Sequence, residues 1–363
     1  MVGNANANGI PFLKRYGIPP AIKNSMILWY DIARQGATNE SMAENPVLKD
    51  LSGNGHDATC NNFAWRGMSG IGGYAISNIE SVIHPNESAN TSVTYDNNII
   101  TCLSLTGNAT SIGRAVLYSR IINFDSRTIK FNGGNYGLIV KQTGEVGVNP
   151  VVIANIAPGE DNIVTVDEDL YNNGHKLLMF GPNTIVPANT SWYFKQLPLY
   201  PNALVFDGED DYALAEGLPL LNKEDGYTVI SRRKWIKGLD VKHCLVSKNT
   251  RWEDEANGGV DGAFAVECDI SNTMSFGIST RINVNLEDVD DFVYQTSKSY
   301  NGKQTIVFGD KQDTNHLCIA GINKSSIWSS SIAVYSLILF NRDLSTEEIE
   351  WVKTNLIPIS TNE

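Results

Sequence analysis

Short strand-like segments, each ended by a turn signal, recur along most of this chain. Between about residues 75 and 200, alternating or apolar runs are separated by the pairs Asn132-Gly133, Thr143-Gly144, Pro158-Gly159 and Asn173-Gly174. Such pairs favour the tight turns that join antiparallel strands, because glycine adopts a positive φ without steric cost. Longer strand-like runs continue from residue 203 onward. The pattern predicts an all-β protein.

The composition agrees with an all-β chain of two domains. Of the 363 residues, 42% are hydrophobic, which is enough for two cores, and only 19% are charged. Helices draw on Ala, Glu, Lys and Leu, whereas this chain is rich in Asn and has 31 glycines. The formal net charge of −12 makes nucleic acid an unsuitable partner. No run reaches the ~20 apolar residues of a membrane span, so we expect none.

The cysteines are odd in number and include no C-x-x-C pair. Such a set cannot form a fully paired disulfide framework and lacks zinc-ligand spacing. We expect small buried side chains that stay reduced, and therefore synthesis in a reducing cytoplasm. The N-terminus also lacks the charged start and apolar core of a secretory signal. The five positions are Cys60, Cys102, Cys244, Cys268 and Cys318.

Residues 1–24 are predicted to form an irregular arm that docks on a partner. Asn and Gly dominate its start, and Gly17-Ile18-Pro19-Pro20 favours an extended or turning path. Several basic residues lie in this arm of an acidic protein, which suits an acidic partner surface. Segments with so little apolar content commonly become ordered only on a partner, and a leader without a role is the alternative. The residues predicted to dock are Phe12, Lys14, Arg15, Tyr16 and Pro19.

Two apolar runs near opposite ends of the chain, and a helix after the second run, frame the larger domain. Met26–Tyr30 and Ser331–Phe340 are nearly continuous apolar segments. Segments of this kind predict strands that are buried on both faces. Ser345 and Glu348 have the spacing of a capping box at the start of a helix. The apolar stripe of that helix consists of Ile349, Val352 and Leu356.

Two separated blocks of the sequence resemble one known pattern. Residues 204–213 (LVFDGEDDYA) resemble the opening F-D-G-x-D-D-Y-V block of laminin-G-like domains in the concanavalin-A-type lectin/glucanase superfamily. Residues 332–349 (IAVYSLILFNRDLSTEEI) are similar to the closing strand of that domain and its R-x-L-S-x-E-E-I helix. Upstream, residues 29–31 and 50–57 (DLSGNGHD) resemble its opening strand and turn. The run 61–70 (NNFAWRGMSG) is similar to proteins encoded by tailed phages of gut bacteria and by their hosts.

The resemblance covers about 25–65 and 203–357 and omits the middle of the chain. It implies a concanavalin-A/laminin-G-like jelly-roll sandwich whose opening strand lies beside its closing strand. The middle segment is then an insertion, which is tolerated where the ends of a loop lie close together. The predicted domains are an N-terminal arm at 1–24, a discontinuous jelly roll at 25–74 and 201–363, and a smaller inserted β-sandwich at 75–200. A short C-terminal helix completes this all-β organisation.

No catalytic constellation is evident in the sequence. A retaining glycosidase needs two carboxylates about 5–5.5 Å apart, and the E-x-D-x-x-E strand of the related glucanases is missing. Glu267 and Asp269 come nearest, and we expect them on a polar solvent face. We expect no enzymatic activity and no required cofactor. The histidines share no ligand spacing and are expected on the surface or in turns, at His56, His84, His175, His243 and His316.

Calcium is the candidate cofactor, because relatives of this kind often bind it on rim loops through oxygen ligands. Two acidic loops, 207–211 and 287–291, could supply those ligands. The alternative for the first loop is a purely structural tight turn, since Asp-Gly is also the ideal turn pair. The alternative for the second loop is a solvated segment. The candidate ligands are Asp207, Asp210, Asp288 and Asp290, with Asp211, Glu287 and Asp291 beside them.

A polar loop at 249–255 is the candidate carbohydrate site. It contains Trp252, and an exposed indole beside hydrogen-bonding side chains is a common way to hold a sugar ring. Packing of the indole at the edge of the core is the alternative. The predicted sugar-binding residues are Asn249, Arg251 and Trp252. Trp29, Trp235 and Trp328 lie in apolar runs and are expected in the core.

These features and the resemblance together indicate a non-enzymatic structural or appendage protein of a phage virion. A head fibre, a capsid decoration and a tail-fibre component all fit. Its expected partners are copies of itself, with a trimer first and a dimer next, other virion proteins, and glycans. Its expected location is the virion, after synthesis in the host cytoplasm. The first alternative is a carbohydrate-binding lectin module on the bacterial cell surface, and the second is a glycoside hydrolase.

Overall fold

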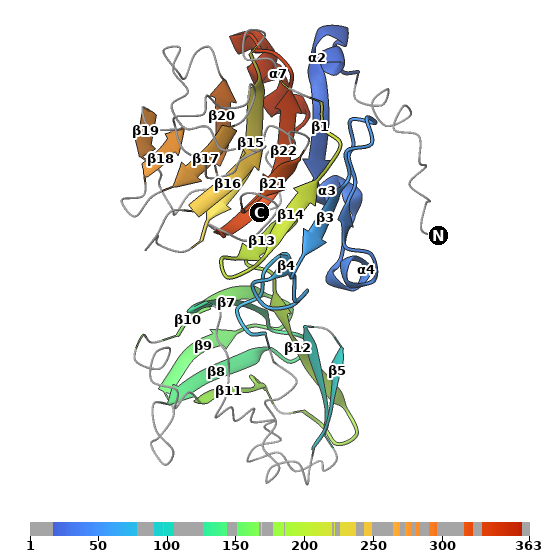
Figure 1. Cartoon of the computed structure of the whole chain (residues 1–363). Coiled ribbons are helices and arrows are strands. Elements are labelled where there is room, and N and C mark those ends of the chain that lie inside the picture. The colour runs from blue at the N-terminus through green and yellow to red at the C-terminus, as the bar shows by residue number, and fades with distance from the viewer. Residues whose placement is uncertain are drawn as a thin grey trace. The chain divides into compact units, whose positions relative to one another are not determined.

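The computed structural model describes residues 17–77, 91–96, 98–104, 126–143, 151–166, 168, 177–184, 186–219, 221, 226–236, 243–248, 264–268, 273–276, 280–283, 290–295, 316–321 and 329–357. The described chain is mostly β-strand and its last element is a short helix, which confirms the all-β class (Figure 1). It divides into two compact units. Unit 1 consists of Met1–Trp65, Ser69–Ile71 and Tyr200–Glu363, and unit 2 of Arg66–Met68 and Gly72–Leu199. No helix in the described ranges is long and apolar enough to cross a membrane.

Unit 1 contains two antiparallel sheets. The strands of the first sheet are β1 (Met26–Asp31), β4 (Gly70–Ile71), β13 (Leu204–Asp207), β15 (Thr228–Trp235), β20 (Asp290–Gln295) and β22 (Ser331–Phe340). They are arranged in the order β20-β15-β22-β13-β4, and β1 also pairs with β22. The strands of the second sheet are β2 (Val47–Leu48), β3 (Ala58–Asn61), β14 (Tyr212–Ala215), β16 (His243–Lys248), β17 (Phe264–Cys268), β18 (Thr273–Phe276), β19 (Thr280–Asn283) and β21 (Leu317–Ile319). Their order is β19-β18-β17-β16-β21-β14-β3-β2.

The first and last strands of unit 1 lie side by side, as the sequence predicted. β1 pairs antiparallel with β22, with Trp29 opposite Ile338 and Tyr30 opposite Leu337 (blue beside red in Figure 1). Every residue of β1 is buried, and its apolar side chains enter two different cores, Ile27, Leu28 and Tyr30 in one and Met26 and Trp29 in the other. This explains why neither strand shows the polar alternation of a half-exposed strand.

The two cores of unit 1 lie on opposite faces of β1 and β22. One takes side chains from both sheets, among them Phe206 and Trp235 from the first sheet and Ile319 from the second. The other lies under two helices, α2 (Pro20–Ser25) and α7 (Thr346–Asn355). Trp29 and Trp235 are buried, as the sequence predicted, and Trp328 lies outside the described residues.

The helices of unit 1 correct the prediction of an irregular arm through residue 24. Residues 20–25 form α2, and Ile18 and Ile22 are buried in the core beneath α7. Pro20 is the first residue of this helix, a position where its missing N–H costs nothing. Only one helix was predicted because α2 and its two neighbours are short and show little periodicity. The neighbours are α3 (Ile32–Gln35) and α4 (Asn39–Glu44).

Unit 2 has its own pair of antiparallel sheets and its own core. Its strands are β5 (Thr91–Asp96), β6 (Ile99–Ser104), β7 (Thr128–Asn132), β8 (Leu138–Thr143), β9 (Val151–Ile156), β10 (Asp161–Thr165), β11 (Leu177–Pro182) and β12 (Ser191–Leu197). One sheet has the order β10-β7-β12-β6-β5 and the other β11-β8-β9. Buried and exposed residues alternate along β7 and β12, which is typical of strands with one solvated face. Phe131, Phe180 and Phe194 pack at the centre of this core.

The chain leaves unit 1 and returns to it at two neighbouring strands. Ile71 in β4 is the last residue before the long segment Gly72–Leu199 of unit 2 and lies opposite Leu204 in β13. The chain re-enters unit 1 at Tyr200. The two ends of the long excursion are therefore close together in unit 1, which is the condition for a tolerated insertion.

Candidate functional site

The turn at residues 50–57 is organised around one buried carboxylate. Asp50 accepts hydrogen bonds from the backbone N–H of Trp29 at 3.0 Å, of Ser52 at 2.9 Å and of His56 at 3.1 Å. It also accepts one from the Ser52 hydroxyl at 2.8 Å. Because a carboxylate accepts four bonds at once, a single side chain fixes the turn and ties it to β1.

The same turn covers the outer edge of β1. The Ser52 hydroxyl donates to the carbonyl of Ile27 at 3.1 Å. The Asn54 amide donates to the carbonyls of Met26 and Ile27 at 2.9 Å and 2.8 Å. These bonds satisfy backbone groups that another strand would otherwise pair with.

A groove of about 730 Å³ opens where this turn meets the start of β1 and the end of β22. Its walls come from α2, the turn, the loop after β14 and the residue that follows β22. Among the described residues that line it there is no aspartate or glutamate. The lining residues are Lys23, Asn24, Met26, Ile27, Ser52, Asn54, His56, Gly217, Pro219 and Asn341.

Four polar side chains of the groove are exposed or half-exposed and have no bonding partner among the described residues. Within the described residues, the side chains of Lys23, Asn24 and Asn341 make no hydrogen bond or ion pair. The imidazole of His56 also makes no hydrogen bond or ion pair within the described residues. The bonds of His56 are made by its backbone: its N–H donates to Asp50 and its carbonyl accepts from the Tyr30 hydroxyl. The backbone at these positions is fixed while the side chains remain available to a ligand.

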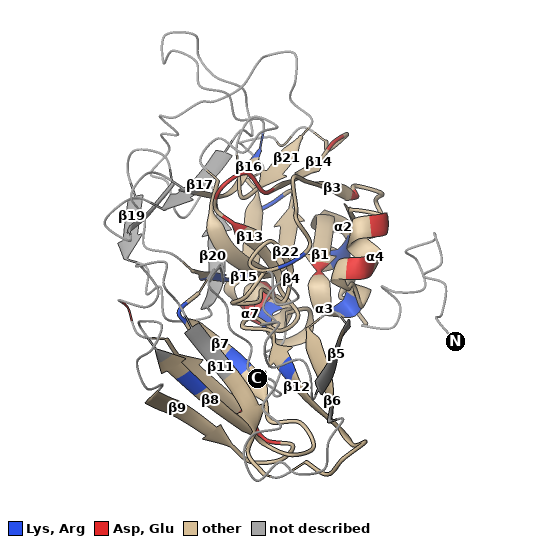
Figure 2. Ribbon diagram, turned by 90° about the horizontal axis from the view of Figure 1, so that it is seen from below, with Lys and Arg blue, Asp and Glu red and all other residues tan. Residues whose placement is uncertain are grey.

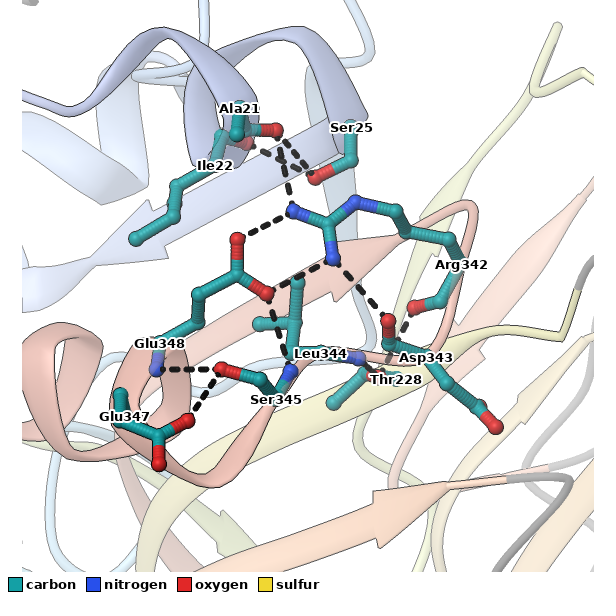
Figure 3. Close-up of polar contacts among 10 residues, drawn as sticks. All are labelled: Ala21, Ile22, Ser25, Thr228, Arg342, Asp343, Leu344, Ser345, Glu347 and Glu348. Carbon is teal, nitrogen blue, oxygen red and sulfur yellow. Dashed lines mark hydrogen bonds and ion pairs between the residues drawn. The ribbon is translucent and has the colours of Figure 1, made fainter.

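The closing motif of the chain holds α2 in place beside the groove. Arg342 donates to both carboxylate oxygens of Glu348, at 2.7 Å and 2.8 Å, and to the carbonyl of Ala21 in α2 at 3.2 Å (Figure 3). The hydrogen bonds from Arg342 lower the pKa of Glu348 below its ordinary value. Ser345 and Glu348 form the predicted capping box of α7. The N–H of Asn341 donates to the carbonyl of Ser25 at 2.8 Å and completes the attachment.

The first acidic loop is a tight turn between β13 and β14. Carboxylate oxygens of Asp207, Asp210 and Asp211 lie within 4.8 Å of one another. Asp207 accepts from the N–H of Glu209 at 2.7 Å, and Asp211 accepts from the N–H of Asp207 at 3.0 Å and from the Ser69 hydroxyl at 3.0 Å. Two of the three carboxylates therefore stabilise the turn itself.

Gly208 shows why this turn needs an Asp-Gly pair. Its φ is +85°, and a Cβ atom at this position would approach the backbone nitrogen of Ser331 to 2.8 Å. The positive φ and this close approach both exclude a side chain at position 208. The tight turn that was the alternative to a calcium site is therefore present. Calcium binding at Asp207 and Asp210 stays a prediction.

The electrostatics of this turn are unusual for a surface loop. Burial, together with the neighbouring charge of Asp207, raises the pKa of Asp211 to about 7. Hydrogen bonds from Asp207 and Ser69 act in the opposite direction, and Asp210 adds to the rise. The Asp211 carboxyl therefore keeps its proton to a higher pH than an exposed aspartate does.

Most of the other predicted site residues are not brought into this region. Asn249, Arg251 and Trp252 lie outside the described residues, as do Asp269, Glu287 and Asp288. Asp290 and Asp291 are not in a loop but begin β20, opposite Arg233 and Arg232 in β15. Of the docking residues, Pro19 is the N-cap of α2 and half-buried, while Phe12, Lys14, Arg15 and Tyr16 lie outside the described residues. Glu267 is in β17, and His316 is buried, contrary to the surface position expected of it.

The groove is not predicted from the sequence, because its residues come from segments with other expected roles. Lys23 was assigned to the arm, and Asn54 and His56 to a turn that resembles the family pattern. The signal that could have identified them is their position at the ends of strands that pair with one another. Polar side chains there project beyond the sheet, where ligands commonly bind.

Charged residues of both signs are spread over the described elements, as Figure 2 shows. Three consecutive basic residues, Arg232, Arg233 and Lys234, lie in β15, where Arg232 and Arg233 are buried.

No family model matches this chain, and no curated protein matches it. Among solved structures, a Trypanosoma rangeli sialidase in complex with sialic acid is similar over 74% of this chain and 63% of that chain, with 11% identity and a TM-score of 0.31. The same sialidase in complex with 2,3-difluoro-KDN is similar over 86% and 69%, with 11% identity and a TM-score of 0.30. The chain thus spans less than two thirds of the first of these structures. Likeness at this level carries no argument about fold or chemistry.

Proposed function

We propose that this protein is a non-enzymatic structural or appendage component of a phage particle, built on a laminin-G-like jelly roll. The observation that carries the proposal is the arrangement of unit 1. Two antiparallel sheets share one core, the first strand is paired with the last, and the excursion to unit 2 starts and ends at neighbouring strands. A rigid β-framework that carries a second folded unit suits a scaffold that presents surfaces to other molecules.

The structural role of the carboxylates at 207–211 supports a protein without enzymatic activity. Asp207 and Asp211 accept backbone N–H bonds within their own turn, so they are committed to its shape. A panel of polysaccharides should therefore be left uncleaved by the purified protein. Hydrolysis that is abolished by Glu267→Gln would establish the glycoside hydrolase alternative instead.

Assembly into particles tests the virion proposal directly. Deleting residues 1–16 should leave a folded protein that no longer joins particles, because the predicted docking residues Phe12, Lys14, Arg15 and Tyr16 are removed. Deleting residues 1–24 is the contrasting variant, since it also removes Ile18 and Ile22 from the core and should destabilise unit 1. Mass spectrometry of density-purified particles measures incorporation. Normal incorporation of the 1–16 deletion would refute the docking role of the arm.

A lectin module on the bacterial surface is the second candidate, and the groove is the observation that favours it. Both candidates predict a glycan contact, so the location of the protein must separate them. Absence from purified particles, together with presence on the bacterial surface, would support the lectin. For the virion component we expect a closed oligomer, with a trimer first, measured by light scattering coupled to size-exclusion chromatography.

A further inference from the structure

The groove beside α2 has the dimensions and the rigid walls of a ligand site. Its volume of about 730 Å³ lies in the range of roughly 300–1,000 Å³ that is usual for small-ligand pockets. Ser52, Asn54 and His56 are held by hydrogen bonds to β1 and to Asp50. The helix α2, which also lines the groove, is held by Arg342 (Figure 3). A site fixed in this way loses little conformational entropy when it binds a ligand.

The charge of the groove points to an anionic ligand. The chain has 40 acidic and 28 basic residues, yet the described lining residues include a lysine and no carboxylate. Lys23 lies in the last turn of α2 and its ammonium has no ion-pair partner among the described residues. A negatively charged group placed here gains the attraction of this ammonium.

The remaining side chains point to a sugar as the carrier of that charge. Asn24 and Asn341 each offer amide donors and a carbonyl acceptor, which match hydroxyl groups that both donate and accept. The exposed Pro219 adds apolar surface that the C–H face of a pyranose can cover. An extended peptide fits less well, because the outer edge of β1 is already covered by Ser52 and Asn54 and cannot pair with an added strand.

We propose that the groove binds a carboxylate-bearing sugar unit, such as a uronic acid residue of an acidic polysaccharide. The Lys23 ammonium binds the carboxylate, and Asn24, His56 and Asn341 bind the hydroxyls. The inference rests on the proposed function, since it names the class of glycan that an appendage of this kind would contact. It also moves the glycan site away from the loop that contains Trp252.

Titration calorimetry of the full-length protein with trigalacturonate tests the proposal, with neutral galactotriose as the matched ligand. We expect binding of trigalacturonate at least tenfold tighter than of galactotriose, and at least a tenfold loss in Lys23→Gln. Lys195→Gln, which changes an exposed lysine of unit 2, should bind like the unaltered protein. Thermal unfolding of Lys23→Gln should match that of the unaltered protein, so a loss of binding is not a loss of fold.

Three outcomes would overturn the proposal. They are undetectable binding of trigalacturonate at millimolar concentration, equal affinity in Lys23→Gln, and equal affinity for a hexaglutamate peptide, which would identify an acidic peptide site. Incorporation of Lys23→Gln into particles is measured separately. If Lys23→Gln joins particles normally but does not bind the sugar, the virion role is retained and the defect lies in the groove.

Discussion

Replacing Asp50 by alanine should destabilise unit 1 more than any surface substitution, because this carboxylate serves four donors. The N–H groups of Trp29 and Ser52 are buried and would lose their acceptor. A buried donor left without a partner costs about 1–3 kcal/mol. The half-buried N–H of His56 can turn to water. Two orphaned donors together predict a loss of about 2–6 kcal/mol for Asp50→Ala.

The design includes a graded variant and a control. Asp50→Asn keeps one oxygen as an acceptor but places the amide N–H groups of asparagine against the N–H donors of the turn. The free energy of unfolding should therefore fall by less than in Asp50→Ala, by about 1–2 kcal/mol. Asp161→Ala removes an exposed carboxylate in unit 2 that accepts one bond from Asn132, and should change stability by less than about 0.5 kcal/mol. Urea unfolding gives the free energies, and amide exchange of residues 26–31 reports on β1 itself. A loss below about 1 kcal/mol in Asp50→Ala, with β1 still protected, would refute the role of Asp50.

Three further predictions follow from buried or paired groups. Because the pKa of Asp211 is raised to about 7, the folded chain keeps a proton that the unfolded chain releases above about pH 4. In EDTA, stability should therefore fall as pH rises from about 4 to 7, by at most about 1.4 kcal/mol per pH unit, and Asp211→Asn should flatten this fall. Arg342→Lys should cost about 1 kcal/mol and speed amide exchange in α7, since lysine cannot bind both oxygens of Glu348; unchanged exchange would contradict this. All five cysteines should react with a thiol reagent after denaturation without reductant, whereas in the native protein Cys102, whose pKa burial raises to about 12, should react slowly; a single reactive thiol would indicate two disulfides.

The strands were predictable from sequence wherever their surroundings are uniform along the run. β22 has the bounds expected of it, and β1 differs from its predicted run only by including Asp31. Both faces of β1 and β22 are buried, so most positions carry an apolar side chain and the signal is strong. The short helices α2, α3 and α4 were missed for the opposite reason. They are too short to show a period, and capping and tertiary contacts define them instead.

The groove could not be predicted because no single segment contains it. Its walls come from residues near 23, 54, 217 and 341, and only the pairing of β1 with β22 brings these together. The acidic turn at 207–211 was predictable as a turn, since its geometry depends on the local Asp-Gly pair. What the sequence could not reveal is that burial places the pKa of Asp211 near neutrality, because burial depends on the strands around it.

The turn at 50–57 serves both stability and the proposed sugar site, and two of its residues separate these roles. The structural bonds of His56 are made by its backbone N–H and carbonyl, so His56→Ala should keep them and lose only contacts to a ligand. Asn54 differs, because its side-chain amide donates to the carbonyls of Met26 and Ile27. Asn54→Ala should therefore lose about 1–2 kcal/mol of stability as well as binding, since two backbone acceptors lose their donor. Parallel unfolding and trigalacturonate titrations should show binding reduced in both variants and stability reduced only in Asn54→Ala. Equal destabilisation by His56→Ala would mean that the imidazole is part of the framework of the turn.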